Sequence, residues 1–315
     1  MSTPAPSSLP NLQDVDLRLL RVFEAVARNR GLSSAQRDLG VTQATISQQL
    51  ACLEGRLGLR LCERGRGGFA LTAEGRDVLA AARTLFRSIE NFRSAVGSTR
   101  GELLGELHFG TVDAMWSNET LNLPGAFAEF SAFAPGVIVH IDIDAPQSLV
   151  QGLAEDRYQL ILAPALDHPN RFNAVPLFAE TQGLYCGRSH ELFTVPDAEI
   201  ALDRLVRYRY AARDYMSGQP DPVGESFRST AFTSHMESIA LLVLSGGYLG
   251  HLPTHFARQW EAQGRMRRLC VRKVSYDDQF HLISRKRETN RAAMILFDCI
   301  SGCCHRSLVT SASTQ

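Results

Sequence analysis

The sequence lacks the patterns that mark several common protein classes. No apolar run approaches the roughly 18 residues of a membrane span, and the N-terminus MSTPAPSSLPNLQ has neither the basic nor the apolar stretch of a secretory signal. The motifs GxSxG, HExxH and the P-loop are missing, as is GxGxxG after a strand. We therefore expect a cytoplasmic protein that is not an enzyme, does not contact a membrane and binds no cofactor.

Cysteine is scarce and irregularly spaced. The seven cysteines are odd in number and form neither a CxxC pair nor a disulfide framework. Cys299, Cys303 and Cys304 cluster, but beyond His305 no histidine or carboxylate completes an evident set of metal ligands. Because cysteine often behaves as a small hydrophobic residue, we expect this cluster to be buried and predict no metal site.

The chain has almost no lysine, and its charges are unevenly distributed. Two lysines stand against 31 arginines. The formal net charge is zero, yet residues 11–100 hold 14 basic and 9 acidic residues, whereas residues 101–315 hold 19 basic and 24 acidic residues. A basic N-terminal third suits contact with a polyanion. With 315 residues, 44% of them hydrophobic, the chain can form two or more domains with substantial cores.

The segment SSAQRDLGVTQATISQQLACLEGRL predicts two short helices joined by a tight turn. Ser33 and Gln36 have the spacing of a capping box. Gly40 suits the left-handed end of the first helix, and Thr42 can cap the second. An apolar stripe marks the inner face of the second helix: Ile46, Leu50, Leu53 and Leu57. Neutral polar residues that can read base edges occupy its N-terminal half: Gln43, Thr45, Ser47, Gln48 and Gln49. The pattern indicates a helix-turn-helix, although an ordinary helical hairpin would share it.

The flanking segments favour DNA binding over an ordinary hairpin. Residues 17–28 (LRLLRVFEAVAR) predict an amphipathic helix that completes a three-helix core. Residues 59–63 and 69–71 are predicted to pair as short strands around a glycine-rich loop. That loop carries Arg64 and Arg66, so it has the form of a wing that contacts phosphates or the minor groove.

A long helix is predicted from Thr72 onward, TAEGRDVLAAARTLFRSIENFRSAV. Its apolar face follows a heptad-like spacing that Arg93 alone interrupts: Leu79, Ala82, Phe86, Ile89 and Val96, widened by Leu85 and Phe92. A face of this length needs a partner. The same helix of a second subunit would place two recognition helices on two half-sites.

In order and spacing, these motifs resemble the DNA-binding half of LysR-type transcriptional regulators. The resemblance is carried by LRLLRVFEAVARN, TQATISQQLACLEGRLG, RLCERG…FALTAEG and the linker helix. The chain departs from the family pattern at Ala44, Gln48 and Gly67, where the family commonly has Pro, Arg and Arg. From the motif and this resemblance together we predict DNA contacts by Ser33, Thr42, Gln43, Thr45, Ser47, Gln48, Arg64 and Arg66.

Beyond a hinge bracketed by Gly101 and Gly105, strands and helices alternate, which predicts a parallel sheet covered by helices. The expected elements are strand 106–112, helix 121–133, strand 137–143, helix 148–155, strand 160–163, a second unit from about Gly183 with helix 235–244 and a short strand ending at Pro253, then strand 274–284 and helix 291–300. The resemblance extends here. It implies two α/β subdomains joined by two crossing strands, similar to a periplasmic binding protein.

The predicted fold class is therefore α/β with an N-terminal winged helix-turn-helix, a long linker helix and a C-terminal two-subdomain effector module. The expected boundaries are a disordered tail at 1–13, a DNA-binding domain at 14–71, a linker helix at 72–100 and an effector domain at 101–315. Within the last, subdomain I takes about 101–180 and 274–315, and subdomain II about 181–273.

Ligands of open α/β sheets bind where strands end and helices begin, and the resemblance places the inducer cleft on the same segments. The candidate residues are Thr111, Asp113, Ala114, Pro146, Ser148, Pro164, Arg213, Thr233 and His235. Asp113 would repel an anion unless it is paired, while Arg213 or His235 could supply positive charge. We expect a small polar or aromatic effector, not necessarily a carboxylate. Alternatively, Asp113 caps a helix and His235 is an ordinary surface residue.

The predicted function is sequence-specific binding to double-stranded DNA under control of that effector. The resemblance implies a homo-oligomer, a dimer or a tetramer, in which the effector changes the angle between subdomains and the spacing of the DNA-binding heads, and it leaves RNA polymerase open as a further partner. Two alternatives differ in class. An architectural DNA-binding protein would need no α/β cleft, and a redox sensor would have to use Cys186 and Cys270, which are far apart in sequence.

Overall fold

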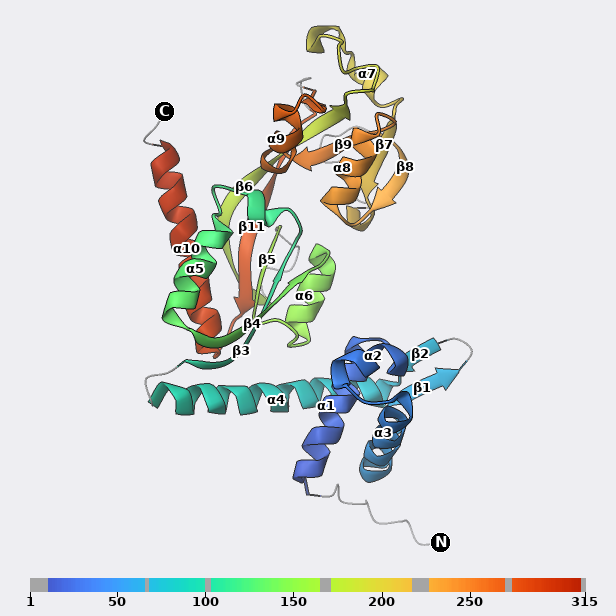
Figure 1. Cartoon of the computed structure of the whole chain (residues 1–315), viewed down its shortest axis with the longest axis vertical. Coiled ribbons are helices and arrows are strands. Elements are labelled where there is room, and N and C mark those ends of the chain that lie inside the picture. Colours follow the sequence, from blue (N-terminus) through green and yellow to red (C-terminus); the bar gives the residue numbers. More distant parts are fainter. Residues whose placement is uncertain are drawn as a thin grey trace. The chain divides into compact units, whose positions relative to one another are not determined.

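The structure, a computed structural model, describes residues 11–65, 68–99, 103–164, 171–216, 227–269 and 274–312. The chain divides into two compact units, Met1–Glu90 and Asn91–Gln315. The predicted fold class, a helix-turn-helix with a hairpin followed by an α/β domain, is confirmed (Figure 1). Within the described ranges, no helix is both long enough and apolar enough to cross a membrane.

The first unit combines three helices, a hairpin and the start of a fourth helix. Its elements are α1 Asp14–Arg28, α2 Leu32–Leu39, α3 Gln43–Leu57, β1 Cys62–Gly65, β2 Gly68–Leu71 and α4 Ala73–Thr99. Phe23 of α1 and Leu50 and Leu53 of α3 are fully buried together. The first helix begins at Asp14, three residues before the predicted start, because the Asp16 carboxylate accepts the Gln13 N–H at 2.9 Å and caps an earlier turn.

The turn between α2 and α3 follows most of the predicted chemistry. Gly40 ends α2 with a φ of 64°, and the Thr42 hydroxyl accepts a backbone N–H of α3 at 3.3 Å, so both predicted caps are confirmed. The predicted capping box at Ser33 is wrong. The helix begins at Leu32 with Gly31 as its N-cap, and no side chain caps it. Ser33 therefore lies inside the first turn of α2.

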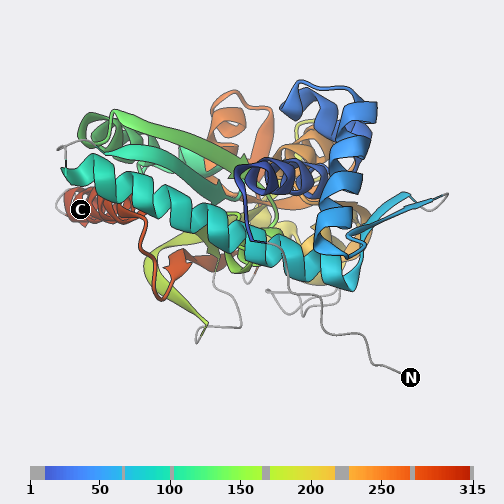
Figure 2. The same cartoon turned by 90° about the horizontal axis from the view of Figure 1, so that it is seen from below.

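The hairpin of β1 and β2 projects from the three helices in both views (Figures 1 and 2). Its strands are displaced from the predicted ones, because pairing extends to Gly65 and Gly68. Arg64 therefore belongs to β1 and not to the loop. Arg66 and the side chain of Arg64 lie outside the described residues.

The start of α4 lies against the backbone that precedes the hairpin. As predicted, Thr72 caps this helix: its hydroxyl accepts the Gly75 N–H at 2.8 Å. The Thr72 N–H donates to the Leu61 carbonyl at 3.1 Å. A Cβ on Gly75 would lie 2.0 Å from that carbonyl oxygen, so only glycine fits this position. The hairpin and α4 are therefore joined at close range.

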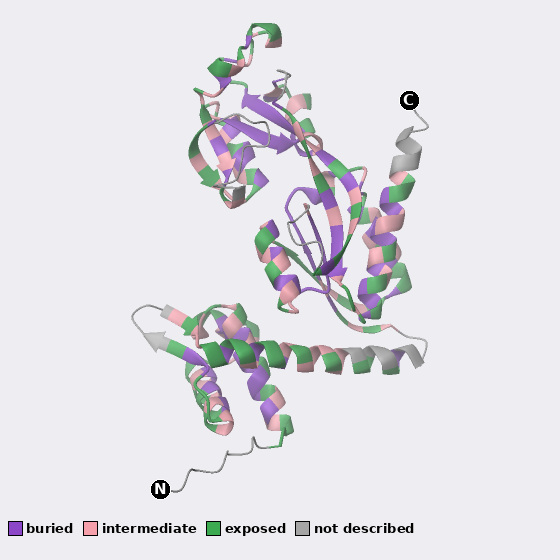
Figure 3. Ribbon diagram, turned by 180° about the vertical axis from the view of Figure 1, so that it is seen from behind, coloured by how far each residue is buried: buried purple, intermediate pink, exposed green. Residues whose placement is uncertain are grey.

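The apolar face of α4 is packed near the start of the helix and has exposed residues farther along; exposed and half-buried positions alternate along its described part (Figure 3). Leu79 and Ala82 are buried in the core of the first unit, with Phe86 packed against them. Farther along, Phe92 and Val96 are 69% and 41% exposed. The domain itself covers the N-terminal half of the predicted heptad face, so only the C-terminal half is available to a second subunit.

The second unit is organised around one nine-stranded sheet in the order β4-β3-β5-β11-β6-β9-β7-β8, with β10 paired to β6. Its strands are β3 Leu104–Thr111, β4 Gly136–Ile143, β5 Leu160–Pro164, β6 Phe172–Gly187, β7 Arg209–Arg213, β8 Arg228–Thr233, β9 Leu249–Pro253, β10 Met266–Arg268 and β11 Tyr276–Arg285. As predicted, β3 runs parallel to β4 and β5. The long strands β6 and β11 pair antiparallel and connect the two halves of the sheet. The predicted alternation located β11 but not the length of β6.

Helices cover both faces of this sheet. They are η1 Met115–Ser117, α5 Leu123–Phe133, α6 Pro146–Ala154, η2 Asp197–Glu199, α7 Leu202–Leu205, η3 Asp214–Met216, α8 Met236–Leu244, α9 Thr254–Ala262 and α10 Arg291–Ala312. On β3, Phe109 meets Phe127 of α5, whereas Gly110 faces Leu149 of α6, so the two helices lie on opposite faces. The last helix continues well past Ile300, where the prediction ended it.

Candidate nucleic-acid interface and ligand cleft

The structure brings together most of the residues predicted to contact DNA. The six that it describes fully are Ser33, Thr42, Gln43, Thr45, Ser47 and Gln48. Gln43 and Gln48 are exposed in the N-terminal half of α3. The Ser33 hydroxyl donates to Gln43 Oε1 at 3.1 Å, and the hydroxyls of Thr42 and Thr45 lie 2.9 Å apart. Neutral side chains that both donate and accept are suited to base edges in a major groove.

Two tertiary contacts support α3 that no local pattern in the sequence reveals. Arg56, in its last turn, donates two hydrogen bonds to Asp16 of α1, one of them at 2.8 Å. These bonds lower the pKa of Asp16. Glu54 Oε1 accepts the N–H groups of Leu61 and Cys62 at 2.8 and 3.2 Å. The polar face of α3 is therefore held rigidly to α1 and to the hairpin.

A second candidate site lies in the second unit, at the carboxyl ends of β3 and β5, where open α/β sheets bind ligands. A cavity of about 10 Å³ there is lined by Val112, Asp113, Met115, Pro164, Glu180, Arg213, Tyr215, Met236, Pro253, Asp278 and Phe280. It includes three predicted residues, Asp113, Pro164 and Arg213. A space this small holds about one water molecule, so the cleft is closed in this conformation.

Asp113 connects the two sides of the cleft by capping a helix on the opposite side. Its carboxylate accepts the Met236 N–H at the start of α8, whose own N-cap residue, His235, makes no side-chain cap. His235 Nδ1 lies 3.9 Å from the same carboxylate and its side chain is half exposed. Burial, and then a hydrogen bond with Glu237, raise the pKa of Asp113 to about 6. Asp113 thus caps a helix, as the alternative predicted, and its contact with an effector stays a prediction.

The other two carboxylates of the cavity are paired with bases. Asp278 accepts a hydrogen bond from Arg213 at 3.1 Å. Glu180 is buried, and its Oε1 lies 2.7 Å from His255 Nε2. The opposite nitrogen of His255 lies 2.9 Å from the hydroxyl of Ser117. Ser117 belongs to η1 and His255 to α9, so this hydrogen-bonded chain spans the cleft. This chain of contacts could not be predicted from the sequence, because nothing local in the sequence relates these residues.

The remaining predicted cleft residues do not line the cavity. They are Thr111, Ala114, Pro146, Ser148, Thr233 and His235. The Thr111 hydroxyl donates to the Val112 carbonyl at 3.1 Å, and the Thr233 hydroxyl accepts the His235 N–H at 3.3 Å. Pro146 opens α6, and Ala114 has a φ of 63° before η1. These side chains therefore shape the turns around the cleft.

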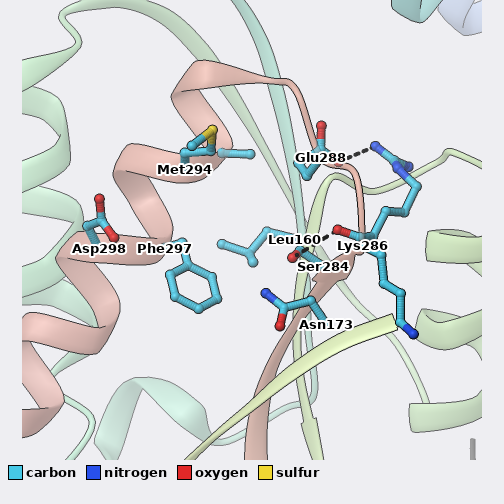
Figure 4. Close-up of a pocket in the computed structure, with 10 residues that line it drawn as sticks. Leu160, Asn173, Ser284, Lys286, Glu288, Met294, Phe297 and Asp298 are labelled. Atoms are coloured by element: carbon cyan, nitrogen blue, oxygen red, sulfur yellow. Dashed lines mark hydrogen bonds and ion pairs between the residues drawn. The ribbon is translucent and has the colours of Figure 1, made fainter. Parts of the chain in front are cut away.

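A larger cavity, of about 220 Å³, lies away from these strand ends, beside the start of α10 (Figure 4). Its lining comprises Leu160, Asn173, Ser284, Arg285, Lys286, Glu288, Ala293, Met294, Phe297 and Asp298. Arg285 is paired with Asp156 at 2.6 Å and with Glu288. Although this space is roomier, we favour the smaller cleft, because three predicted residues and the contacts between subdomains converge there.

The cysteines of α10 are buried, as predicted. Cys299, Cys303 and Cys304 lie in the core that α5 and α10 share with the sheet. Burial raises the pKa of the Cys299 and Cys304 thiols. Burial also raises the pKa of Cys186 to about 11, which disfavours the reactive thiolate. Cys270, the other cysteine of the redox alternative, lies outside the described residues.

Comparison with known proteins gives one consistent result. Two family models match: a bacterial regulatory helix-turn-helix protein of the lysR family over residues 17–76, and a LysR substrate binding domain over residues 100–300. The chain is 32% identical over 280 residues to the HTH-type transcriptional activator BauR of Pseudomonas aeruginosa, covering 89% of this chain and 92% of that one.

Solved structures share the fold at lower identity. Full-length CbnR complexed with its target DNA has a TM-score of 0.61 and 20% identity, covering 91% of this chain and 99% of that one. Full-length OxyR from Pseudomonas aeruginosa has a TM-score of 0.59 and 19% identity, covering 92% of this chain and 95% of that one.

Proposed function

The chain belongs to the LysR family of bacterial transcriptional regulators, and from this premise we propose which of its surfaces bind DNA, effector and a second subunit. It is a DNA-binding transcriptional regulator with a helix-turn-helix domain and a C-terminal effector-binding domain. Its curated and structural relatives are regulators, in agreement with the absence of enzyme motifs from the sequence.

We propose that α3 enters the major groove and that Gln43, Ser47 and Gln48 read bases. Thr42, Arg64 and Arg66 then contact phosphates or the minor groove. The observation that carries this assignment is the exposed, uncharged polar face of α3 on a helix fixed by the Asp16–Arg56 ion pair.

Gel-shift and footprinting experiments on the DNA upstream of this protein's own gene test the regulator's function directly. A protected inverted repeat whose footprint shortens or shifts with one metabolite of a small panel would establish both the operator and the effector class. Failure to bind any DNA, even at low salt where phosphate contacts are strongest, would contradict the assignment of α3.

We propose that the effector binds between the two halves of the second unit and carries a cationic or hydrogen-bond-donating group. Three carboxylates line the cavity against one arginine. Asp278 and Glu180 pair closely with bases, whereas the base beside Asp113, His235, is 3.9 Å away and a further carboxylate, Glu237, also lies beside it. A cationic group placed there would relieve the repulsion between these two acids. This proposal specifies the predicted polar effector further, and it still does not require the effector to be a carboxylate.

Effector binding then requires the closed cleft to open. The contacts that would have to rearrange are the Asp113 cap on α8 and the Ser117–His255–Glu180 chain. We propose that this change of angle between subdomains is passed to the DNA-binding heads, and that RNA polymerase responds to the altered DNA. Calorimetry with the identified metabolite should show loss of binding in Asp113→Ala. Unchanged affinity would remove Asp113 from the site.

We propose that the chain forms a homo-oligomer, with one contact through the exposed end of α4 and another through the edges of the sheet. Phe92 and Val96 supply the first contact. Exposed apolar residues supply the second: Ile138, Ile141 and Ile143 on the edge strand β4, Phe232 on the opposite edge strand β8, and Leu241 on α8. Two such contacts in one chain support a tetramer built from dimers. The domain boundaries stay as predicted, with the linker at 72–100.

Sedimentation of the full chain tests both contacts. A Phe92→Glu variant should lose one association step, and an Ile141→Glu variant the other, because a charge would be buried in each apolar contact. If both variants sediment as the unsubstituted chain does, neither surface joins subunits.

A further inference from the structure

Three side chains with metal-binding atoms converge on one face of the strand pair β3 and β4. The two strands are parallel, and His108 lies directly opposite His140 in the register. Glu106 precedes His108 by two residues, so alternation along β3 places both on the same face. Among the described residues, this trio is the group in which at least three such ligand atoms lie within 4.8 Å of one another.

The distances within the trio fit ligands of one ion better than partners in hydrogen bonds. Glu106 Oε2 lies 3.6 Å from Nε2 of His108 and 3.6 Å from Nε2 of His140. That is too long for a hydrogen bond. Around a tetrahedral zinc ion, with bonds of about 2.0–2.2 Å, neighbouring ligand atoms are roughly 3.3 Å apart. Small side-chain rotations would bring all three atoms to this spacing.

The two imidazole rings lie next to each other, and one ring has to rotate about its side-chain bonds before both Nε2 lone pairs point to one ion. The rings stack with centroids 4.3 Å apart and planes within 8°. In the single chain His108 is half-buried, whereas Glu106 and His140 are exposed. His140 lies between Ile138 and Ile141 on β4, so the ion would bind beside the proposed subunit contact.

The backbone of the site is fixed before any ligand arrives. The His108 N–H donates to the Gln159 side chain at 2.7 Å. The Glu106 carbonyl accepts a hydrogen bond from Asn290 at 3.4 Å. The parallel ladder holds His140 in register with His108. A fixed backbone reduces the entropy lost when the three side chains order around an ion.

We propose that Glu106, His108 and His140 bind one divalent transition-metal ion of the zinc class, with water completing the coordination. Two imidazoles and one carboxylate are a ligand set that zinc commonly takes when a fourth position stays open. Binding would tie the edge strand β4 to β3 by a contact outside the backbone ladder. Its residues are none of those proposed for DNA or effector binding, and it departs from the sequence prediction of no metal site.

The direct test is a titration of the full, untagged, metal-free chain with Co²⁺, followed by visible absorption. We expect one ion per chain, a spectrum typical of nitrogen and oxygen ligands, and no thiolate charge-transfer band, because the ligands are not cysteines. A thiolate band on the first equivalent, or no binding at all, would overturn the proposal.

Matched histidine variants locate the ion. His140→Gln should weaken Zn²⁺ binding in calorimetry by more than the roughly 10–100-fold that loss of an outer-shell partner costs. His281→Gln is the control, since this histidine lies on β11, where its Nδ1 is 3.2 Å from the Gln279 carbonyl oxygen. Equal affinity in the two variants would contradict the assignment.

A melting experiment keeps the test informative if a variant folds poorly. At a free concentration a hundredfold above its dissociation constant, Zn²⁺ should raise the melting temperature of the second unit within the full, unsubstituted chain by roughly 5–10 °C. Glu106→Gln should melt normally without metal and gain much less from it. An unchanged melting temperature of the unsubstituted chain at saturating Zn²⁺ would refute a stabilising site on β3 and β4.

Discussion

The polar face of α3 and the cleft of the second unit hold their side chains in different ways. On α3, Gln43 and Gln48 are exposed, and the helix is fixed from behind by Asp16 and Arg56. In the cleft, the residues proposed to meet the effector also hold the fold together, since Asp113 caps α8 across the cleft.

This difference predicts how function and stability separate in each region. Side chains at the end of a rigid helix can be removed without disturbing what supports them. Buried, paired side chains cannot, because removing one partner leaves the other without compensation. Substitutions on α3 should therefore change recognition alone, whereas substitutions in the cleft should change stability and signalling together.

The double variant Gln43→Ala with Gln48→Ala should show the largest effect. If each glutamine contributes about 1–3 kcal/mol of base discrimination, preference for the specific site falls roughly 30-fold or more. Weak, salt-sensitive binding should persist. Competition gel shifts measure the preference, with the exposed Gln263→Ala as control. The free energy of unfolding, followed by thermal melting, should change by less than about 0.5 kcal/mol. Retained preference would mean that another element reads the sequence.

His255→Ala should cause the largest loss of stability in the cleft. The substitution leaves Glu180 buried without its base, and breaking a buried pair in this way costs about 3–5 kcal/mol. Urea unfolding followed by tryptophan fluorescence measures it, because both tryptophans, Trp116 and Trp260, belong to the second unit.

The matched control for His255 is Arg258→Ala on the same helix. Arg258 also pairs across the cleft, with Glu119 at 3.0 Å, but both side chains are mostly exposed. Its loss should cost below about 1 kcal/mol. Similar losses in the two variants would show that burial does not determine how much free energy each ion pair contributes to stability.

Asp113→Asn should remove a pH dependence. The pKa of Asp113 is about 6 in the folded chain against 3.8 for the unperturbed group, so the folded state binds this proton more tightly. The contribution of Asp113 to the free energy of unfolding is therefore fully present below about pH 4. It is lost as pH rises through about 6, and the loss is at most about 3 kcal/mol. Groups facing this carboxyl are Glu237, His235 and Tyr215.

The asparagine variant keeps a cap for the Met236 N–H but carries no charge, so it should be more stable than the unsubstituted chain at pH 8. Urea unfolding between pH 4 and 8 measures the difference. Asp203→Asn, an exposed position in the same unit, should leave the pH dependence unchanged. The predicted sign would be wrong if the stability of the second unit rose with pH in the unsubstituted chain and not in Asp113→Asn.

Ser33→Ala should show the smallest effect. A true N-cap hydroxyl contributes about 1 kcal/mol, but the N-cap of α2 is Gly31. The Ser33 hydroxyl makes an exposed hydrogen bond to Gln43 instead. We expect the free energy of unfolding, measured by thermal melting, to change by less than about 0.5 kcal/mol. A loss of a full kcal/mol would restore the capping box that the sequence predicted.

Local chemistry was predictable from the sequence wherever it involves neighbouring residues. The Thr42 and Thr72 caps and the left-handed Gly40 follow from side-chain type and position alone. The error at Ser33 has a local cause too, since several residues near it were compatible with a helix start.

Distant contacts were not predictable, because they depend on register and packing. The Glu180–His255 pair joins residues 75 positions apart, and Asp16–Arg56 joins residues 40 apart. The His108–His140 pair needs the exact pairing of two strands, since a slip of one residue would put one ring on the other face. Asp113 was selected by its place at a strand end, but its partner Met236 emerged only from the fold.

The paired strands β6 and β11 have a mechanical consequence for the second unit. Their hydrogen-bonded ladder resists sliding of one strand along the other, so the two subdomains cannot shear apart. The ladder is interrupted at one place, where Phe280 pairs with Phe178 but His281 pairs with Pro176, and Leu177 bulges out. A bulge bends and twists a ribbon most easily at that point. The bulge lies at the subdomain I end of the ribbon, where β11 also pairs with β5. We therefore expect an effector that enters the cleft to twist this two-stranded connection, so that one subdomain rotates relative to the other.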